Sequence, residues 1–189
     1  MRKLKLQMQL SVDGFAAAGP NDEQEWVTWA LDEIAPHVLQ LFDSTDTIII
    51  GRKLAVDYIP YWQETFKKPQ DPMHAFAERI VAAKKVVFTK TLNRSEWENT
   101  ELATGDLTTE IQRLKSLPGK DLVVYGGCEL VAGLIAGNLI DEYHFFINPV
   151  ALGTGIPVFQ QLNSIQRLKL VKAEAYPSGI VLLQYTRAV

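Results

Sequence analysis

The chain has 189 residues, a formal net charge of −3 and 47% hydrophobic residues. This size and composition suit a single domain over residues 1–189 with a substantial core, and they argue against a disordered chain. The interspersed charges argue against nucleic acid or an anionic membrane as a partner, and the single cysteine excludes an intrachain disulfide. No apolar run is long enough to span a bilayer and the N-terminus lacks a signal-peptide core, so we expect a cytoplasmic protein.

The first quarter of the chain predicts a strand, a loop, a long helix and a second strand. Apolar and polar residues alternate from Lys3 to Val12, which is the period of a strand. Residues 16–22 are rich in alanine, glycine and proline and predict a loop. A helical pattern covers Glu23–Phe42, in which Pro36 predicts a kink or an interruption. The β-branched run Thr47–Ile50 predicts the next strand, which ends at a glycine.

Strands and helices continue to alternate until the C-terminal third, where strands dominate. A short helix follows residue 51 and is broken by Pro60. The later expected elements are the helices Asp71–Ala83 and Asp106–Leu117, the strands Lys85–Thr89 and Ile140–Val150, the strand–helix unit Leu122–Ala136, and the hairpin of Leu168–Ala175 with Ile180–Arg187. This order predicts an α/β fold with a mostly parallel sheet covered by helices and an antiparallel edge at its C-terminal end.

Three predicted strands end in residues suited to phosphate binding, and a parallel sheet would bring these ends to the same edge. Glycines let backbone N–H groups approach a phosphate, helix starts supply such groups, and cations add charge. The residues are Gly51, Arg52 and Lys53 at the end of the strand Thr47–Ile50, Thr89 and Lys90 at the end of the strand Lys85–Thr89, and Gly126 and Gly127 after the strand that begins at Leu122. Each group alone has an ordinary explanation, as surface cations or a tight turn, but their conjunction indicates a nucleotide-cofactor enzyme.

The remaining reactive residue types indicate no second chemistry. The G-x-G-x-x-G fingerprint of ordinary Rossmann domains is absent. The three histidines, at positions 37, 74 and 144, lack metal-ligand spacing, and we expect no metal. Cys128 follows the glycine pair at a helix start, where its pKa could fall, but a buried structural cysteine is the better interpretation.

Four segments, taken in order, resemble the dihydrofolate reductase-like superfamily: LSVDGFAA, IIIGRK, VVFTK and VVYGGCEL. The run GGCELVAGLIAGNLIDEYHFFINPVALGTGIPVF is more specific and resembles the reductase domain of bacterial riboflavin biosynthesis, the RibD C-terminal domain, and its stand-alone relatives. The resemblance covers nearly the whole chain. It implies a three-layer fold, with a central mixed, mostly parallel sheet of about eight strands between helices, and NADPH as the hydride donor.

The resemblance also implies where the cofactor binds. The two alanines after the first strand would lie beside the nicotinamide and ribose, the cations would hold the adenosine-side phosphates, and the glycine pair with the next helix start would wrap the pyrophosphate. The implied cofactor-binding residues are Ala16, Ala17, Gly51, Arg52, Lys53, Thr89, Lys90, Gly126, Gly127, Cys128, Glu129 and Leu130. The cations favour NADPH over NADH, because the additional 2′-phosphate needs a positive partner.

The catalytic group is less defined than the cofactor site. Folate reductases carry a carboxylate on the first helix, and the matching position falls at or next to Leu31, one residue before Asp32. We expect the substrate cleft between residues 11–18 and the first helix, with Asp32 and Asp13 as candidate catalytic carboxylates. The candidate wall residues are Asp13, Trp26, Trp29, Asp32 and Tyr58. Their aromatic rings would stack on a flat heterocycle, although core packing is the alternative for each tryptophan.

Three functions are consistent with these residues. The first is an NADPH-dependent reductase of a small heterocyclic or pyrimidine-type substrate, similar to 5-amino-6-(5-phosphoribosylamino)uracil reductase without the zinc deaminase half, whose signature is absent. The second is a dihydrofolate reductase, and the third is a nucleotide-binding dimeric protein without catalysis. In each case we expect a small-molecule ligand, no nucleic-acid or membrane partner, and a homodimer, with Ile140–Val150 as the strand most suited to pair across a two-fold axis.

Overall fold

The computed structural model describes residues 1–20 and 24–188 and contains two sheets. The large sheet has eight strands in the order β5-β4-β3-β6-β1-β7-β10-β9, and β2 and β8 form a small two-stranded sheet. The strands are β1 (Leu4–Ser11), β2 (Phe15–Ala17), β3 (Thr45–Gly51), β4 (Lys84–Phe88), β5 (Thr100–Ala103), β6 (Asp121–Gly126), β7 (Glu142–Asn148), β8 (Ile156–Pro157), β9 (Leu168–Ala175) and β10 (Val181–Arg187). Every pairing from β5 to β7 is parallel, whereas β10 pairs antiparallel with both β7 and β9.

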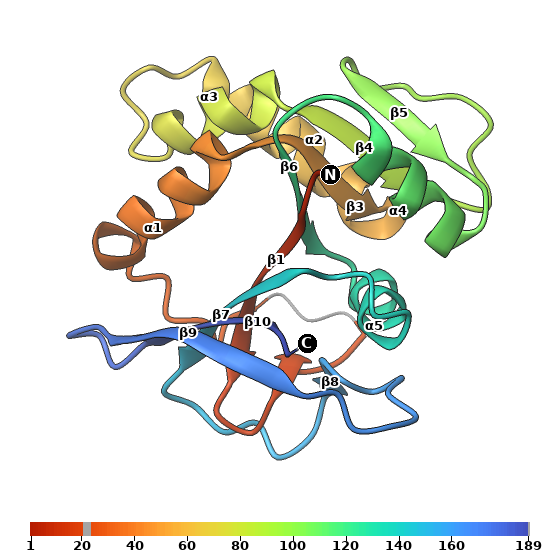
Figure 1. Cartoon of the computed structure of the whole chain (residues 1–189). Helices are drawn as coiled ribbons and strands as arrows, with labels where there is room; N and C mark the ends of the chain where they lie inside the picture. The colour runs from red at the N-terminus through yellow and green to blue at the C-terminus, as the bar shows by residue number, and fades with distance from the viewer. Residues whose placement is uncertain (21–23, 189) are drawn as a thin grey trace.

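Five helices cover the two faces of the large sheet, which gives three layers (Figure 1). They are α1 (Leu31–Asp43), α2 (Arg52–Phe66), α3 (His74–Ala82), α4 (Leu107–Ser116) and α5 (Cys128–Ala136). Buried side chains of α1, α2 and α3 pack on one face, and those of α4 and α5 pack on the other. The predicted fold class, with its antiparallel C-terminal edge, is therefore confirmed.

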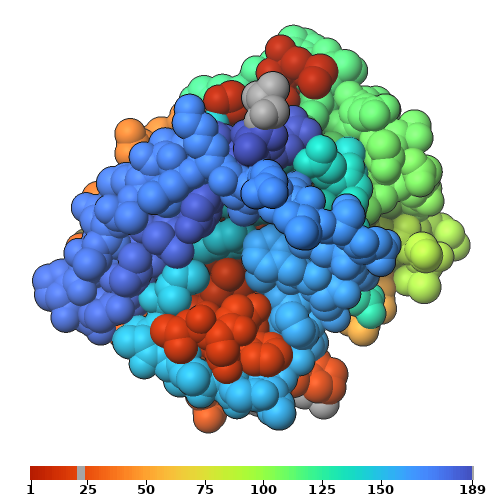
Figure 2. All heavy atoms as spheres, turned by 60° about the horizontal axis from the view of Figure 1, so that its bottom comes forward, coloured from red at the N-terminus to blue at the C-terminus, as the bar shows by residue number. Residues whose placement is uncertain are grey.

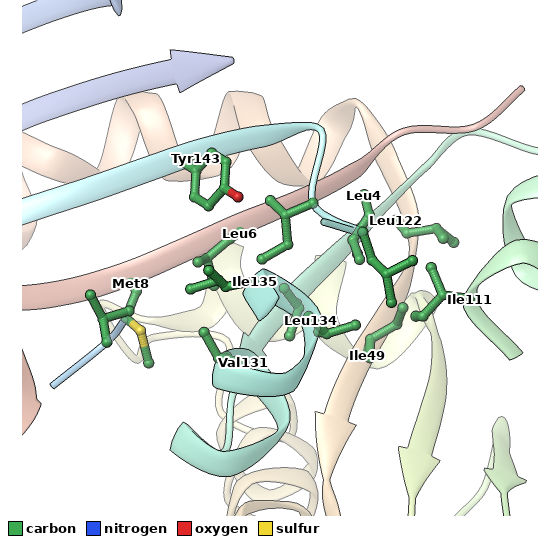
Figure 3. Packing of buried hydrophobic residues seen from close by; sticks show 14 of the residues in the cluster. Leu4, Leu6, Met8, Ile49, Ile111, Leu122, Val131, Leu134, Ile135 and Tyr143 are labelled. Carbon is green, nitrogen blue, oxygen red and sulfur yellow. The ribbon is translucent and has the colours of Figure 1, made fainter. Parts of the chain in front are cut away.

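The core under α4 and α5 follows from the alternation in β1. Leu4 and Leu6 are fully buried and point toward α5, where they meet its apolar side chains Val131, Leu134 and Ile135 (Figure 3). Tyr143 of β7 points into the same cluster (Figure 3). The packing of α5 on this cluster holds the start of the helix directly beyond the end of β6. Within the described residues, no helix has the length and apolarity needed to cross a bilayer.

Helix α1 begins later than the sequence predicts. The predicted start at Glu23 lies outside the described residues, and residues 24–30 form no helix, so that α1 begins only at Leu31. This segment is instead fixed to the sheet, because the Thr28 N–H donates to Oδ1 of Asn148 over 2.8 Å. A tertiary hydrogen bond thus overrides local helical propensity.

The predicted break of the second helix at Pro60 is wrong, since α2 continues through it to Phe66. Pro36 likewise lies inside α1 without interrupting it. Both proline residues are exposed, and each costs its helix one backbone hydrogen bond, which the packing of the rest of the helix compensates. Helix α3 starts at His74 rather than Asp71, because Asp71 forms a turn in which its Oδ1 accepts from the Met73 N–H.

The short strands β2, β5 and β8 were not predicted. They have three, four and two residues, too few to show a periodic pattern. Strand β2 overlaps the predicted loop 16–22 at Ala16 and Ala17, where the loop prediction is therefore wrong. The remaining predicted helices and strands are present with small shifts at their ends, as for α4, where the Asp106 side chain accepts from the Thr109 N–H as N-cap.

A pair of histidines, of which His144 is buried and His37 partly exposed, joins α1 to the sheet. Nε2 of His37 in α1 lies 2.9 Å from Nδ1 of His144 in β7, and the other ring nitrogen of His144 lies 3.6 Å from the Glu142 carboxylate. Burial, with contributions from His144 and Lys172 that outweigh the opposing effect of Glu174, lowers the pKa of His37 to about 4 from 6.5. The nearby His144 ring, with help from Lys3 and Lys5, lowers the pKa of Glu142 to about 2.

We expect the protein to lose stability as the pH falls from 6.5 toward 4. Because the folded-state pKa of His37 lies below its ordinary value, the unfolded chain binds this proton first, and the stabilisation present above pH 6.5 disappears toward pH 4. The side chain is partly exposed, so solvent screening reduces the loss to about 1–2 kcal/mol. Denaturant unfolding at pH 7 and pH 4.5 measures it. His37→Gln should reduce the pH dependence, and an unchanged dependence in this variant would contradict the assignment.

Candidate functional site

The strand ends predicted to bind phosphate lie at one edge of the sheet. Strand β3 lies between β4 and β6, with Gly51 opposite Phe88 on one side and Ile50 opposite Gly126 on the other. Strands β1 and β7 end beside them, where Ser11 is opposite Asn148. The residues that follow β3, β4 and β6 are therefore brought together at the carboxyl edge, as ligand sites in open α/β sheets require.

Glycine is needed where β3 and β6 end, because the backbones of these two segments approach each other closely. A Cβ atom on Gly127 would lie 3.4 Å from Cα of Gly51, and one on Gly126 would lie 2.9 Å from Cδ2 of Leu54. The φ angles of Gly126 and Gly127 are +149° and +85°, a region that side chains rarely adopt. The glycine pair therefore leaves bare backbone in front of α5.

The start of α5 supplies backbone donors at this place. Gly127 is its N-cap, and the first turn of an α-helix has N–H groups without intrahelical acceptors. Cys128 and Leu130 are partly buried against the core, whereas Glu129 is exposed. A carboxylate repels phosphate, so Glu129 can contribute to an anion site only through its backbone N–H.

Three cations lie at the same edge. Arg52 and Lys53 are the first residues of α2, and Lys90 is exposed two residues beyond the end of β4. None of them forms an ion pair with any residue that the structure describes. At the opposite edge of the sheet the cations are paired, as Lys115 is with Asp141 over 2.5 Å. The carboxyl edge thus has positive charge left to bind an anion.

Thr89 shapes the loop that carries Lys90. It is buried, and its hydroxyl oxygen accepts from the N–H groups of Thr91 and Leu92, both over 3.1 Å. Its own N–H donates to the carbonyl of Ala103 in β5. These contacts fix the direction of the chain after β4 and leave the Thr89 hydroxyl hydrogen as the group that could reach a ligand.

Ala16 and Ala17 lie in strand β2 and are buried. Ala16 belongs to the core cluster under α5, and Ala17 is paired with Ile156 of β8. A Cβ on Gly155 would come within 2.2 Å of the Ala17 carbonyl oxygen, so the small sheet also depends on a glycine. With their side chains packed inward, these alanines can meet a cofactor only through their backbone.

Asp13 ties two loops together at this edge. Its carboxylate accepts from the Ser11 hydroxyl over 2.6 Å and from the N–H groups of Leu152 and Gly153 over 3.1 and 2.7 Å. Figure 2 shows the turn after β1 surrounded by the segment that follows β7. The Ser11 hydrogen bond, and then those of Gly153 and Leu152, lower the pKa of Asp13 to about 2. A carboxyl group with so low a pKa is a poor proton donor near neutral pH.

Asp32 lies in the first turn of α1 and is exposed. Its neighbour Glu33 accepts from the Ser178 N–H in the β9–β10 turn, which fixes the start of the helix. Trp29, just before the helix, is 50% exposed. The structure therefore places Asp32 and Trp29 at the same helix start.

Asn148 was missed by sequence reasoning, although it is the most connected polar residue at this edge. It is fully buried at the end of β7. Its Oδ1 accepts from the Thr28 N–H, and its Nδ2 donates to Oε1 of Gln9 over 2.9 Å. An asparagine at the end of an apolar strand is the one signal that could have identified it. It holds the segment before α1 against the sheet.

An aromatic cluster lies next to the glycine pair on the α1 and α2 face. Tyr125, directly before Gly126, stacks on Phe42 at a centroid distance of 5.6 Å, and the ring of Tyr58 lies 5.5 Å from it. Tyr58 also contacts Trp62. Burial raises the pKa of both tyrosine hydroxyls, so both remain neutral. The prediction included Tyr58 alone, because only the fold brings these four rings together.

Comparison with known proteins identifies relatives over the full length. A sequence model of the RibD C-terminal domain matches residues 2–182. An uncharacterised protein of Bacillus subtilis strain 168, YyaP, is 32% identical over 187 residues, which are 97% of this chain and 94% of YyaP. A second one from the same strain, YwjB, is 27% identical, with 99% of each chain covered.

Solved structures with this fold have low sequence identity to the chain. A putative riboflavin biosynthesis protein from Shewanella sp. PV-4 has a TM-score of 0.74 at 18% identity, with 99% of each chain covered. A diaminohydroxyphosphoribosylaminopyrimidine deaminase/5-amino-6-(5-phosphoribosylamino)uracil reductase from Thermotoga maritima has a TM-score of 0.71 at 17% identity. This chain spans 57% of that protein. The architecture is thus of the dihydrofolate reductase-like type.

Proposed function

The chain belongs to the RibD C-terminal domain family, and we propose that it is a reductase that transfers a hydride from NADPH to a small heterocyclic or pyrimidine-type substrate. Family membership supports a pyrimidine reductase-like function. The observation that carries the cofactor assignment is the convergence of the glycine pair, the α5 start and three cations without ion-pair partners at one edge of the sheet.

Each group at this edge has a separate role in the proposal. The backbone at Gly126, Gly127 and the first turn of α5 would hold the pyrophosphate, because N–H groups there point away from the helix. Arg52 and Lys90, with Lys53, would pair with the 2′-phosphate. Bound NADPH would supply the hydride, and the protein would hold the substrate against it and limit water.

The substrate would lie beyond the nicotinamide, between α1 and the turn after β1. The aromatic cluster of Tyr58, Trp62, Tyr125 and Phe42 is packed in the core beside the glycine pair, so it would support this part of the site from behind rather than contact the substrate. Asp32 would hydrogen-bond the edge of the substrate ring, whereas Asp13 would act by holding the loop rather than by donating a proton. The final proton would come from water or through Asp32.

We expect Arg52→Ala and Lys90→Ala to weaken NADPH binding by about tenfold each, which corresponds to the loss of one charge-assisted contact. NADH binding should change little, because NADH lacks the 2′-phosphate. Lys68→Ala is the matched control: it removes an exposed cation two residues beyond the end of α2 and should leave both affinities unchanged. Fluorescence titration of the wild type and the three variants with NADPH and with NADH measures these affinities. An equal loss of NADPH and NADH affinity would contradict the assignment to the 2′-phosphate.

A dihydrofolate reductase and a non-catalytic nucleotide-binding protein are the alternative functions. Oxidation of NADPH in the presence of dihydrofolate, pteridines and aminouracil ribotides separates them. Activity restricted to dihydrofolate would favour the folate reductase, and binding of NADPH without oxidation of any substrate would favour the non-catalytic protein.

We also propose a homodimer, but not through the predicted strand. The expected pairing through Ile140–Val150 is wrong, because β7 is hydrogen-bonded to β1 and β10 on its two sides. The large sheet ends in β5 on one side and in β9 on the other, and Leu170 and Val171 of β9 are 51% and 54% exposed. An apolar edge strand is suited to pairing with a second copy. Light scattering should give twice the 21.2 kDa chain mass, and a value for one chain would contradict the dimer.

A further inference from the structure

The carboxyl edge of the sheet is divided into a cationic half and a half without cations. Arg52, Lys53 and Lys90 follow β3 and β4, on one side of β6. On the other side, the segments that leave β1 and β7 contain no lysine or arginine over residues 12–30 and 149–166. The β9–β10 turn, residues 176–179, contains none either.

Among residues 1–20 and 24–188, no cation from elsewhere compensates for this composition. The sequence has no lysine or arginine between Lys5 and Arg52, a stretch that includes all of α1. On β9 the nearest one, Lys172, lies inside the strand and forms an ion pair with Glu174 over 2.7 Å. Arg187 ends β10 at the opposite edge of the sheet, where it pairs with Asp141.

The helix start on this half carries negative charge instead. Helix N-termini attract anions, and α1 begins here. Its first turn contains Asp32 and Glu33, and the turn after β1 adds Asp13. Asp32 and Glu33 lie at the positive end of the helix and, together with Asp13, repel a second anion, whereas a neutral ring with N–H donors would bind to Asp32.

We infer that the substrate of the proposed reductase carries no phosphate group and is a neutral or cationic flat heterocycle. This inference rests on the proposed function. A ribosyl phosphate on the substrate would need positive charge on the half of the cleft that has none, so the phosphorylated substrate that gives the Thermotoga maritima relative its name would bind poorly. The two halves of the edge thus separate the phosphates of NADPH from the substrate.

Calorimetric titration of the protein saturated with NADP⁺ tests this inference, with an aminouracil riboside and its 5′-monophosphate as probes. Binding of NADP⁺ is measured first, and its absence would count against the proposed function rather than the substrate class. With NADP⁺ bound, the riboside should bind at least about tenfold more tightly than the monophosphate. Equal or tighter binding of the monophosphate would overturn the inference. So would failure of both probes to bind, because the inference requires a site for the uncharged one.

Two variants that each raise the net charge by one sharpen the test. Asp32→Asn removes a carboxylate from the start of α1, and Gln40→Lys adds a cation at an exposed position near the other end of the same helix. Asp32→Asn should raise the affinity for the monophosphate relative to the riboside by roughly threefold, the effect of one charge through water. Gln40→Lys should leave the ratio unchanged. Equal ratios in the two variants would contradict a local electrostatic cause.

Discussion

Replacing Gly127 with alanine is expected to remove most of the affinity for NADPH. The new methyl group would lie 3.4 Å from Cα of Gly51 and in front of the α5 start, where the pyrophosphate is proposed to lie. Because the backbone must move to relieve both the contact and the positive φ angle, we expect an affinity loss of at least about tenfold. The folded protein should lose roughly 1–2 kcal/mol of stability from the φ angle alone. Fluorescence titration and denaturant unfolding measure the two effects.

Gly14→Ala is the matched control. The φ angle of Gly14 is +84°, against +85° for Gly127, but no atom lies within 4 Å of the added methyl group. The control should therefore lose a similar amount of stability and keep its NADPH affinity. If both variants lose the same affinity, the effect comes from general destabilisation and the glycine pair is not the pyrophosphate site.

Replacing Asn148 with leucine is expected to cause the largest loss of stability. The change would leave the Gln9 side chain and the Thr28 N–H without their partners in a buried place. Each unsatisfied buried group costs about 1–3 kcal/mol, so we expect a loss of about 3 kcal/mol. The segment before α1 would also lose its fixed position, which should reduce reductase activity even where the variant remains folded. Denaturant unfolding and NADPH oxidation measure the two losses.

Thr28→Ala separates the role of Asn148 from that of the neighbouring side chain. The hydrogen bond uses the backbone N–H of Thr28, so alanine retains it. This control should remain within about 0.5 kcal/mol of the wild type. A similar loss in both variants would show that the segment depends on the threonine side chain rather than on Asn148.

The fold could be predicted largely from local patterns. The alternation in β1, the β-branched runs and the helix signals fixed most elements and their order, because each depends on residues near one another in the sequence. The start of α1 could not be predicted, because it depends on the hydrogen bond between Thr28 and Asn148, 120 residues apart. The continuity of α2 through Pro60 depends on tertiary packing, which local propensity does not report.

The site was predictable where it depends on strand ends. Parallel pairing places Gly51 opposite Phe88 and Ile50 opposite Gly126. The three weak motifs that follow these strands therefore lie together at one edge of the sheet. The substrate side was less predictable. Asp13 was a candidate catalytic group because it is a carboxylate in the loop after β1. Its hydrogen bonds with Leu152 and Gly153, which give it a role in holding the loop, come from a segment far away in the sequence. The aromatic cluster around Tyr125 likewise requires α1, α2 and β6 to be in place.

The central claim is that the carboxyl edge of this sheet binds NADPH. Thermal unfolding of the protein at increasing NADPH concentration tests it most directly, because a ligand that binds only the folded state raises the melting temperature. The melting temperature should rise saturably, by the equivalent of about 2.7 kcal/mol at a concentration one hundred times the dissociation constant, and should rise less with NADH at the same concentration. An unchanged melting temperature at millimolar NADPH would contradict this claim.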